Sequence, residues 1–141
     1  MRAPAVIGGL LFNADAFVAN WVNAKCGAVK FCPPYTAIGV VSGGVLTAGA
    51  VFHSDYGSDI TVTAASAAPS LRLRSAIRAG LSYAFEQLHV PRVSAEIELS
   101  NVRMVRLAKG LGFVREGVKR RAAADGGHVG IFGLLKKDFK L

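Results

Sequence analysis

The sequence has few of the residues that support metal or disulfide chemistry. Its 141 residues include two cysteines, Cys26 and Cys32, and three histidines, with no CxxC pair and no cysteine–histidine spacing typical of zinc sites. We therefore expect no bound metal. Reduced thiols in a cytoplasmic protein are the simplest interpretation of the cysteines, and a disulfide between them stays open.

Acidic residues are also scarce, and the imbalance of charge is uneven along the chain. Nine Asp and Glu stand against 17 Lys and Arg, for a net charge of +8. Residues 101–141 alone carry ten basic and three acidic residues, a net charge of +7. This basic third predicts contact with a phosphorylated ligand, a nucleic acid or an acidic surface. Few aromatic residues lie among these cations, which argues against single-stranded nucleic acid, because that ligand needs stacking platforms.

One stretch has no charge at all. Residues 31–54 contain no Asp, Glu, Lys or Arg, and this length is sufficient to span a bilayer. The stretch also carries two prolines and four glycines, and Gly43-Gly44 separates two β-rich runs. We therefore predict a hairpin rather than a membrane segment. The apolar run Ala3–Phe12 is interrupted by proline and glycine, which disfavours a signal peptide.

Hydrophobic periodicity and turn residues predict ten elements. They are strand Ala5–Ile7, helix Asp15–Lys25, strands Ala37–Ser42, Val45–His53 and Ile60–Ala64, helix Leu71–Leu88, strand Arg92–Leu99, a helix from the N-cap Asn101 to Leu111, and strands Val114–Val118 and Val129–Leu135. The strand–helix–strand unit in the middle predicts two parallel neighbouring strands with a right-handed crossover. We therefore expect one α/β domain over residues 1–141, with a mixed sheet and helices on its faces.

Three motifs in the second half of the chain resemble a known family. They are Tyr83-Ala84-Phe85-Glu86-Gln87-Leu88 at a helix end, the run from Arg92 to Asn101, and the run from Leu111 to Arg120 that contains GF..EG..R. Together they resemble the GNAT superfamily of acyl-CoA N-acyltransferases, more closely the ribosomal-protein N-terminal acetyltransferases and their short members from bacteriophages and prophages. The resemblance covers residues 55–135 well and residues 1–50 loosely.

The resemblance implies a fold and a reaction. The fold is a mixed, mostly antiparallel sheet with helices on both faces, whose central parallel strands, here Ile60–Ala64 and Val93–Leu99, splay apart to admit acetyl-CoA. The reaction is direct attack of a primary amine on the thioester in a ternary complex. The amine belongs to a protein N-terminus, a lysine or a small molecule. A cytoplasmic protein of a bacterial host is implied as well, and a homodimer stays open.

The resemblance also assigns residues that bind acetyl-CoA. They are Val62, Thr63, Ala64, Arg72, Leu73, Arg74, Ser75, Asn101 and Arg106. The first three offer their backbones to the pantetheine arm, and residues 72–75 offer charge and amides to the pyrophosphate. Pro69 and Leu71 replace the two glycines of the family's pyrophosphate loop, so charge from the arginines has to substitute for close backbone approach. A solvated helix start is the alternative for these arginines. Arg103, Arg106 or Lys109 is the expected partner of the CoA 3′-phosphate.

The catalytic candidates are Glu96, Glu98 and Asn101. Glu96 and Glu98 alternate onto one face of their strand, where a carboxylate can act through water on an ammonium substrate. A solvent-facing polar edge is the alternative. Asn101 either orients the cofactor or a water, or serves only as an N-cap. The tyrosine and serine that act as proton donors in family members are replaced here by Ala108 and Met104.

Two further residues lie where the acceptor approaches in this fold. His53 and Asp55 lie at the end of the second strand of the predicted hairpin, and His53 has an intrinsic pKa suited to proton transfer. A structural histidine is the alternative. The basic C-terminal third also supports a competing function, in which a phage protein of this fold modifies DNA or binds nucleic acid without catalysis.

Overall fold

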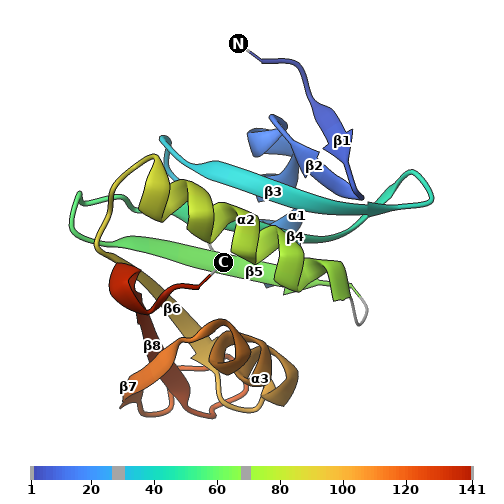
Figure 1. The fold of residues 1–141 in the computed structure, drawn as a ribbon. Coiled ribbons are helices and arrows are strands. Elements are labelled where there is room, and N and C mark those ends of the chain that lie inside the picture. The colour runs from blue at the N-terminus through green and yellow to red at the C-terminus, as the bar shows by residue number, and fades with distance from the viewer. Residues whose placement is uncertain (1, 27–30, 68–70, 141) are drawn as a thin grey trace.

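The computed structural model describes residues 2–26, 31–67 and 71–140 and contains eight strands and three α-helices (Figure 1). The elements are β1 (Ala5–Ile7), β2 (Leu10–Phe12), α1 (Asp15–Cys26), β3 (Thr36–Ser42), β4 (Val45–His53), β5 (Ile60–Ser66), α2 (Leu71–Glu86), β6 (Arg92–Glu98), α3 (Val102–Leu111), β7 (Val114–Lys119), β8 (Val129–Leu135) and a short 3₁₀ helix, η1 (Lys136–Asp138).

All eight strands form one sheet in the order β1-β2-β3-β4-β5-β6-β8-β7. Every neighbouring pair is antiparallel except β5 and β6, which are parallel. Figure 1 shows α2 and α1 on opposite faces of this sheet. The prediction of a mixed, mostly antiparallel sheet with a central parallel pair and helices on both faces is confirmed.

Two hydrophobic cores hold the helices against the sheet. The larger core lies between the sheet and helices α2 and α3, and Phe52, Phe85 and Phe132 are fully buried in it. The smaller core lies between the sheet and α1, where Val18 and Val22 are fully buried. Each such side chain contributes about 1.5–3 kcal/mol through burial, so packing rather than helix propensity fixes where the helices lie.

Three features differ from the sequence-based prediction. The strand β5 continues to Ser66 and does not end at Ala64. The strand β2 was not predicted, because the apolar run around it hides a tight turn. Gly8 and Gly9 adopt φ angles of 58° and 80°, which reverse the chain and pair β1 with β2. The helix α2 ends at Glu86 rather than at Leu88, and His89 has a φ of 57°. Leu88, the last residue of the predicted helix, lies beyond the end of α2 and is 37% exposed.

The uncharged stretch forms the predicted hairpin. The strands β3 and β4 pair across the turn at Gly43-Gly44, and β4 also pairs with β5. No helix in the described ranges has the length and apolar character needed to cross a membrane. Cys26 and Cys32 are free thiols at exposed positions.

Helix α2 lies very close to β4 because Gly80 has no side chain. A Cβ at Gly80 would lie 1.9 Å from the ring of the fully buried Phe52. Gly110 in α3 offers a contrast, because a Cβ there would have no atom within 4 Å. Gly80 therefore permits the close contact between α2 and the Phe52 ring, whereas Gly110 only lowers the helix propensity of α3.

We expect Gly80→Ala to destabilise the protein by about 1–3 kcal/mol, because the Phe52 ring must move within a packed core. Gly110→Ala should instead stabilise it, by up to about 1 kcal/mol, through helix propensity alone. Urea unfolding of both variants measures the difference. Stabilisation by both substitutions would show that α2 and β4 do not pack as closely as described.

Candidate active site

The parallel strands β5 and β6 are paired only at their beginnings. Ile60 pairs with Val93 and Thr61 with Ser94, and no further pair is present in these two described strands. Each strand remains paired on its other side, β5 with β4 and β6 with β8. A gap therefore opens in the middle of the sheet. The backbone N–H and C=O groups of residues 62–65 that point away from β4 face this gap.

A chain of polar contacts joins the two strands where the gap begins. The Nε of Arg92 donates to the hydroxyl of Ser94 at 2.9 Å, and that hydroxyl donates to the Asp59 carboxylate at 2.7 Å. Arg92 also donates two hydrogen bonds to Glu116 on β7. These hydrogen bonds lower the pKa of Glu116 and raise the pKa of Arg92. The contacts tie the start of β5 to β6 and β7.

The ion pair between Arg92 and Glu116 crosses β8 at a glycine. The strand β8 lies between β6 and β7, and Gly133 pairs with Ser94 on one side and Val114 on the other. A Cβ at Gly133 would lie 2.6 Å from the guanidinium nitrogens and 2.7 Å from the carboxylate. The absence of a side chain at Gly133 therefore leaves the space that the ion pair occupies.

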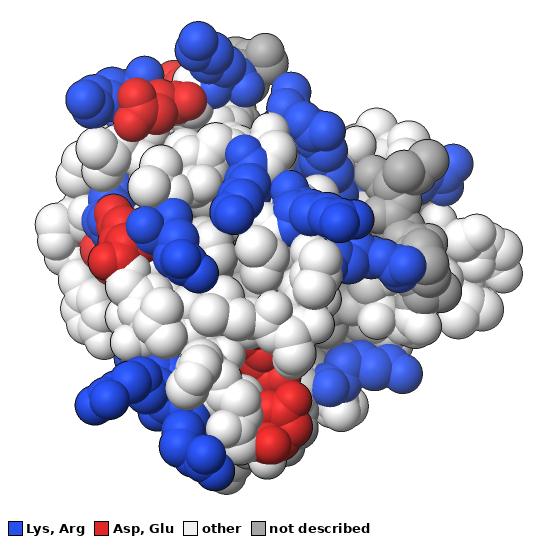
Figure 2. Space-filling view, turned by 90° about the horizontal axis from the view of Figure 1, so that it is seen from below, with Lys and Arg blue, Asp and Glu red and all other residues white. Residues whose placement is uncertain are grey.

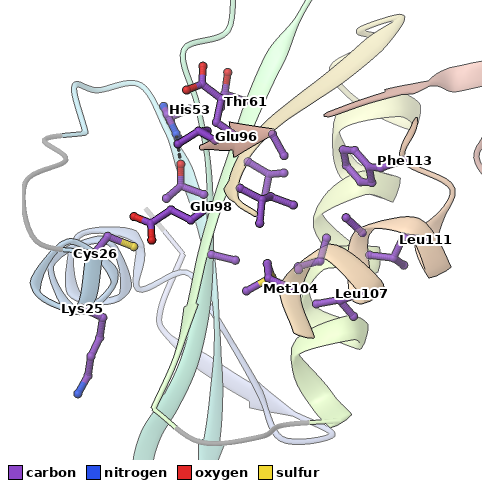
Figure 3. Close-up of a pocket in the computed structure, with 18 residues that line it drawn as sticks. Lys25, Cys26, His53, Thr61, Glu96, Glu98, Met104, Leu107, Leu111 and Phe113 are labelled. Carbon is purple, nitrogen blue, oxygen red and sulfur yellow. Dashed lines mark hydrogen bonds between the residues drawn. The ribbon is translucent and has the colours of Figure 1, made fainter. Parts of the chain in front are cut away.

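The gap borders a cavity of about 610 Å³ that is lined from both faces of the sheet (Figure 3). This volume is typical of ligand pockets. The polar lining, on the α1 face, comprises Lys25, Cys26, His53, Thr61, Thr63, Glu96 and Glu98, and the apolar lining from α2 and α3 includes Ile77, Met104, Leu107, Ala108 and Leu111. Figure 3 shows the two groups on opposite sides of the strands. The cavity thus has one polar and one apolar end.

His53 is held in a fixed orientation at the polar end. Its Nε2 lies 2.8 Å from the hydroxyl of Thr63, and its Nδ1 lies 2.9 Å from the hydroxyl of Ser54. The ring of Phe31 packs against it with a centroid distance of 4.8 Å. Burial lowers the pKa of His53 below its ordinary value of 6.5, so the ring is neutral at pH 7.

The two carboxylates of β6 are in different environments. Both oxygens of Glu96 lie 3.0 Å from the Nζ of Lys119, whereas Glu98 has no ion pair among the residues that the structure describes. Glu98 instead lies near Cys26 (Figure 3). Desolvation, followed by the charge of Glu98, raises the pKa of the Cys26 thiol. Cys26 therefore remains protonated at neutral pH and is a poor nucleophile.

The structure brings together part of the predicted site. Of the residues expected from the sequence, Val62, Thr63, Ala64, Glu96 and Glu98 line the cavity. Met104 and Ala108, at the positions where the resemblance led us to look for proton donors, line it as well, so its α3 wall is apolar there. Asn101 is outside the lining, and its side chain caps α3 by accepting from the N–H of Met104 at 3.2 Å.

The residues expected to bind pyrophosphate lie at the start of α2, beside the cavity lining rather than within it. Arg72, Arg74 and Ser75 are exposed there, and Leu73 is buried in the larger core. A guanidinium nitrogen of Arg74 donates to the carbonyl of Gly110 at the end of α3, at 3.3 Å. The preceding Pro69 lies outside the described residues, as does the side chain of Leu71.

Basic side chains predominate on one face of the molecule. Figure 2 shows this face, seen from below the view of Figure 1, with more blue than red on it. On α3, Arg103, Arg106 and Lys109 are exposed and spaced by three residues, so they share one face of the helix. None of the three has an ion-pair partner in the described part of the chain.

Sequence reasoning named four of these residues but missed the two contacts that they make. Alternation along β5 places Thr61 and Thr63 on one face, but the contact of Thr63 with His53 depends on the register of β4 and β5. Similarly, Arg92 and Glu116 were noticed only as parts of a motif. Their ion pair spans three strands, so no local signal in the sequence indicates it.

Comparison with known proteins identifies the fold. No protein-family model and no curated protein sequence matches the chain. Among solved structures, the ribosomal-protein-S5-alanine acetyltransferase from Vibrio fischeri matches with a TM-score of 0.73 and 11% identity, over 99% of this chain and 100% of that one. A "Probable acetyltransferase" matches with a TM-score of 0.76 and 15% identity, over 96% and 97%.

A third match is solved with ligands. It is the spermidine N-acetyltransferase from Vibrio cholerae in complex with CoA and spermine, with a TM-score of 0.65 and 16% identity, over 75% of this chain and 68% of that one. Together with the sheet order, these matches show that the chain has the GNAT acetyltransferase fold.

We expect Glu116→Gln to lower the free energy of unfolding at pH 7 by about 0.2–1 kcal/mol, because the carboxylate is 40% exposed and screened by solvent. The pKa of Glu116 is lowered in the folded protein, so its contribution is complete above its ordinary value of 4.5 and is lost as the pH falls through the folded pKa. Urea midpoints of the two proteins should therefore converge in acid.

The matched control is Glu86→Gln, because Glu86 is exposed and has no ion pair among the described residues. Its midpoint should follow that of the parent protein at every pH. A constant difference between Glu116→Gln and the parent across the whole range would contradict the role of the ion pair.

Proposed function

We propose that this chain is an acetyl-CoA-dependent N-acetyltransferase that acts on a primary amine, with residues 1–141 working as one domain. The gap between β5 and β6 is the observation that supports this most strongly, because an open strand edge inside a sheet suits an extended, amide-containing substrate. The cavity beside it is apolar on one face and polar on the other. One protein of the same fold has been solved with CoA and a polyamine.

The residues around the gap fit the pantetheine arm and the phosphates of acetyl-CoA. In this proposal the backbones of Val62, Thr63 and Ala64 bind the arm as a neighbouring strand would. The N-terminus of α2, with Arg72 and Arg74 beside it, favours a pyrophosphate through its dipole and the two positive charges. The outer face of α3, which includes Arg106, is then available to the 3′-phosphate.

Direct transfer is the chemistry that these residues support. Acetyl-CoA supplies an activated acetyl group as a thioester. The amine enters from the α1 face, where Glu96 and Glu98 attract and orient an ammonium group. After loss of a proton, its nitrogen attacks the carbonyl carbon, the C–N bond forms, and the C–S bond breaks to release CoA. Backbone N–H groups in the gap stabilise the oxyanion. No covalent enzyme intermediate is needed, in keeping with a protonated Cys26.

Acetyl-CoA should raise the melting temperature of the protein. At about 100 times its dissociation constant a ligand adds roughly 2.7 kcal/mol, which is several degrees for a domain of this size. Replacing both Arg72 and Arg74 by alanine should weaken the affinity roughly tenfold or more, because charge-assisted hydrogen bonds are lost. Arg78→Ala, further along α2, is the control and should keep the shift. No shift with acetyl-CoA, CoA or 3′-dephospho-CoA would overturn the proposed function.

Transfer is tested with a panel of amines, namely spermidine and a peptide that begins with alanine, by detecting the acetylated product. Met104→Trp should abolish both product formation and the thermal shift, because the larger side chain fills the apolar end of the cavity. Val102→Trp is the matched control, since Val102 is on the same helix, is 52% exposed and does not line the cavity. Equal activity of the two variants would show that the cavity is not the site of reaction.

A second function rests on the exposed face of α3. Three basic side chains without ion-pair partners in the described residues, Arg103, Arg106 and Lys109, form a stripe that suits the backbone of a duplex nucleic acid. Such binding would weaken steeply with salt. The result that would support this function is a rise in melting temperature with duplex DNA and no rise with acyl-CoA.

A further inference from the structure

We propose that Thr63, His53 and Ser54 form a proton relay, which takes the proton of the acceptor ammonium group and passes it to solvent. This inference rests on the proposed function and names the base of that reaction. Neither carboxylate of β6 is required as the base in this scheme. The evidence for the relay is the geometry at the polar end of the cavity, where the side chains of Thr63, His53 and Ser54 lie in sequence at hydrogen-bond distances.

The inner end of the relay lies at the gap. Thr63 is two residues beyond Thr61, the last residue of β5 that pairs with β6, and it lines the cavity. In the register of β4 and β5, His53 pairs with Thr61, so Thr63 is its diagonal neighbour on the same face. Their side chains meet at 2.8 Å (Figure 3). The Thr63 hydroxyl is thus the inner group of the relay, on the face from which an amine would enter.

The outer end of the relay reaches solvent. The Nδ1 of His53 contacts the hydroxyl of Ser54 at 2.9 Å, and this contact is exposed. Ser54 directly follows β4 and has a φ of 56°, a conformation that costs free energy in a residue with a side chain. Phe31 packs on the histidine ring and restrains it. The ring therefore bridges a group in the cavity and a group at the surface.

The proton transfer balances in the following way. Thr63 donates its hydroxyl proton to Nε2 of His53 and receives a proton from the ammonium nitrogen, which leaves a neutral amine with a lone pair. His53 is then an imidazolium and gives its Nδ1 proton to the hydroxyl of Ser54, whose own proton passes to water. The ring is left with its proton on Nε2. After the product leaves, this proton passes to water in the emptied cavity and another returns to Nδ1 through Ser54, which restores the resting tautomer. The amine attacks the thioester, and the second proton lost from nitrogen balances the thiolate that leaves. The relay requires a resting His53 with its proton on Nδ1.

The neighbouring charged groups leave His53 available as the acceptor. Glu96 is bound by Lys119, and Cys26 is held in its protonated form. Lys25 and Glu98 line the same cavity, and Asp55, in the turn after Ser54, accepts from the N–H of Gly57. Burial keeps the ring neutral at pH 7, the state that can accept a proton. Among these groups, Glu98 is the competing base.

The kinetic test follows kcat and KM against pH with acetyl-CoA and whichever amine of the panel is acetylated. The parent protein should show an inflection below pH 6.5, above which activity is high. His53→Gln and Thr63→Val should lose this inflection and about 100-fold or more in kcat, with KM for acetyl-CoA unchanged. Thr63→Ser should restore activity. The hydroxyl of Thr61 makes no hydrogen bond to His53 in the described residues, so Thr61→Val should keep the inflection.

Three results would overturn the relay while the proposed function stands. They are a parental pH profile in His53→Gln, a parental profile in Thr63→Val, and loss of the inflection in Glu98→Gln alone.

A tautomer measurement tests the relay without turnover. Long-range nitrogen–proton NMR of the parent above the pKa should show His53 protonated on Nδ1, and Thr63→Val should shift the Nε2 signal. Protonation on Nε2 would overturn the relay even in a protein that acetylates no amine.

Discussion

The early separation of β5 from β6 is the constraint on which the rest of the molecule depends. Two parallel strands that remained paired would close the sheet and bury the backbone groups that now face a cavity. The strands diverge although each is paired on its other side, β5 with β4 over residues 61–66 and β6 with β8 over residues 92–98. The hydrogen bonds among Asp59, Ser94 and Arg92 hold the point of divergence, and the ion pair to Glu116 extends this bracing across β8 to β7.

Much of the fold could be predicted from the sequence because most elements are marked locally. The period of the apolar residues identifies α2, Asn101 and Gly112 mark the ends of α3, and Gly43-Gly44 marks a hairpin. The missing strand β2 was hidden because two apolar strands joined by Gly8 and Gly9 read as one interrupted run. The parallel arrangement of β5 and β6 could be predicted from the length of the crossover between them and from the resemblance. The number of residues over which the two strands pair could not, because no local sequence pattern indicates it.

The site was less predictable than the fold, for a physical reason. Backbone positions such as Val62 and Ala64 follow from the position of a strand, so the sequence could indicate them. The partners of side chains depend on register across strands. Glu96 could be placed on a face, but its contact with Lys119 could not be foreseen, nor could that of His53 with Thr63. Pro69 and the side chain of Leu71, which the resemblance compares with a pyrophosphate loop, lie outside the described residues, so the role of this segment stays a prediction.

The division of the cavity between the two faces of the sheet determines which substitutions alter which end of the site. One end is built by α1 and β4 together with the polar faces of β5 and β6, and the other by α2 and α3. Substitutions in α1 or in the turn after β4 alter the polar end without touching the apolar wall. Under the proposed function, such substitutions would change which amine is accepted while leaving the apolar wall of the cavity as it is.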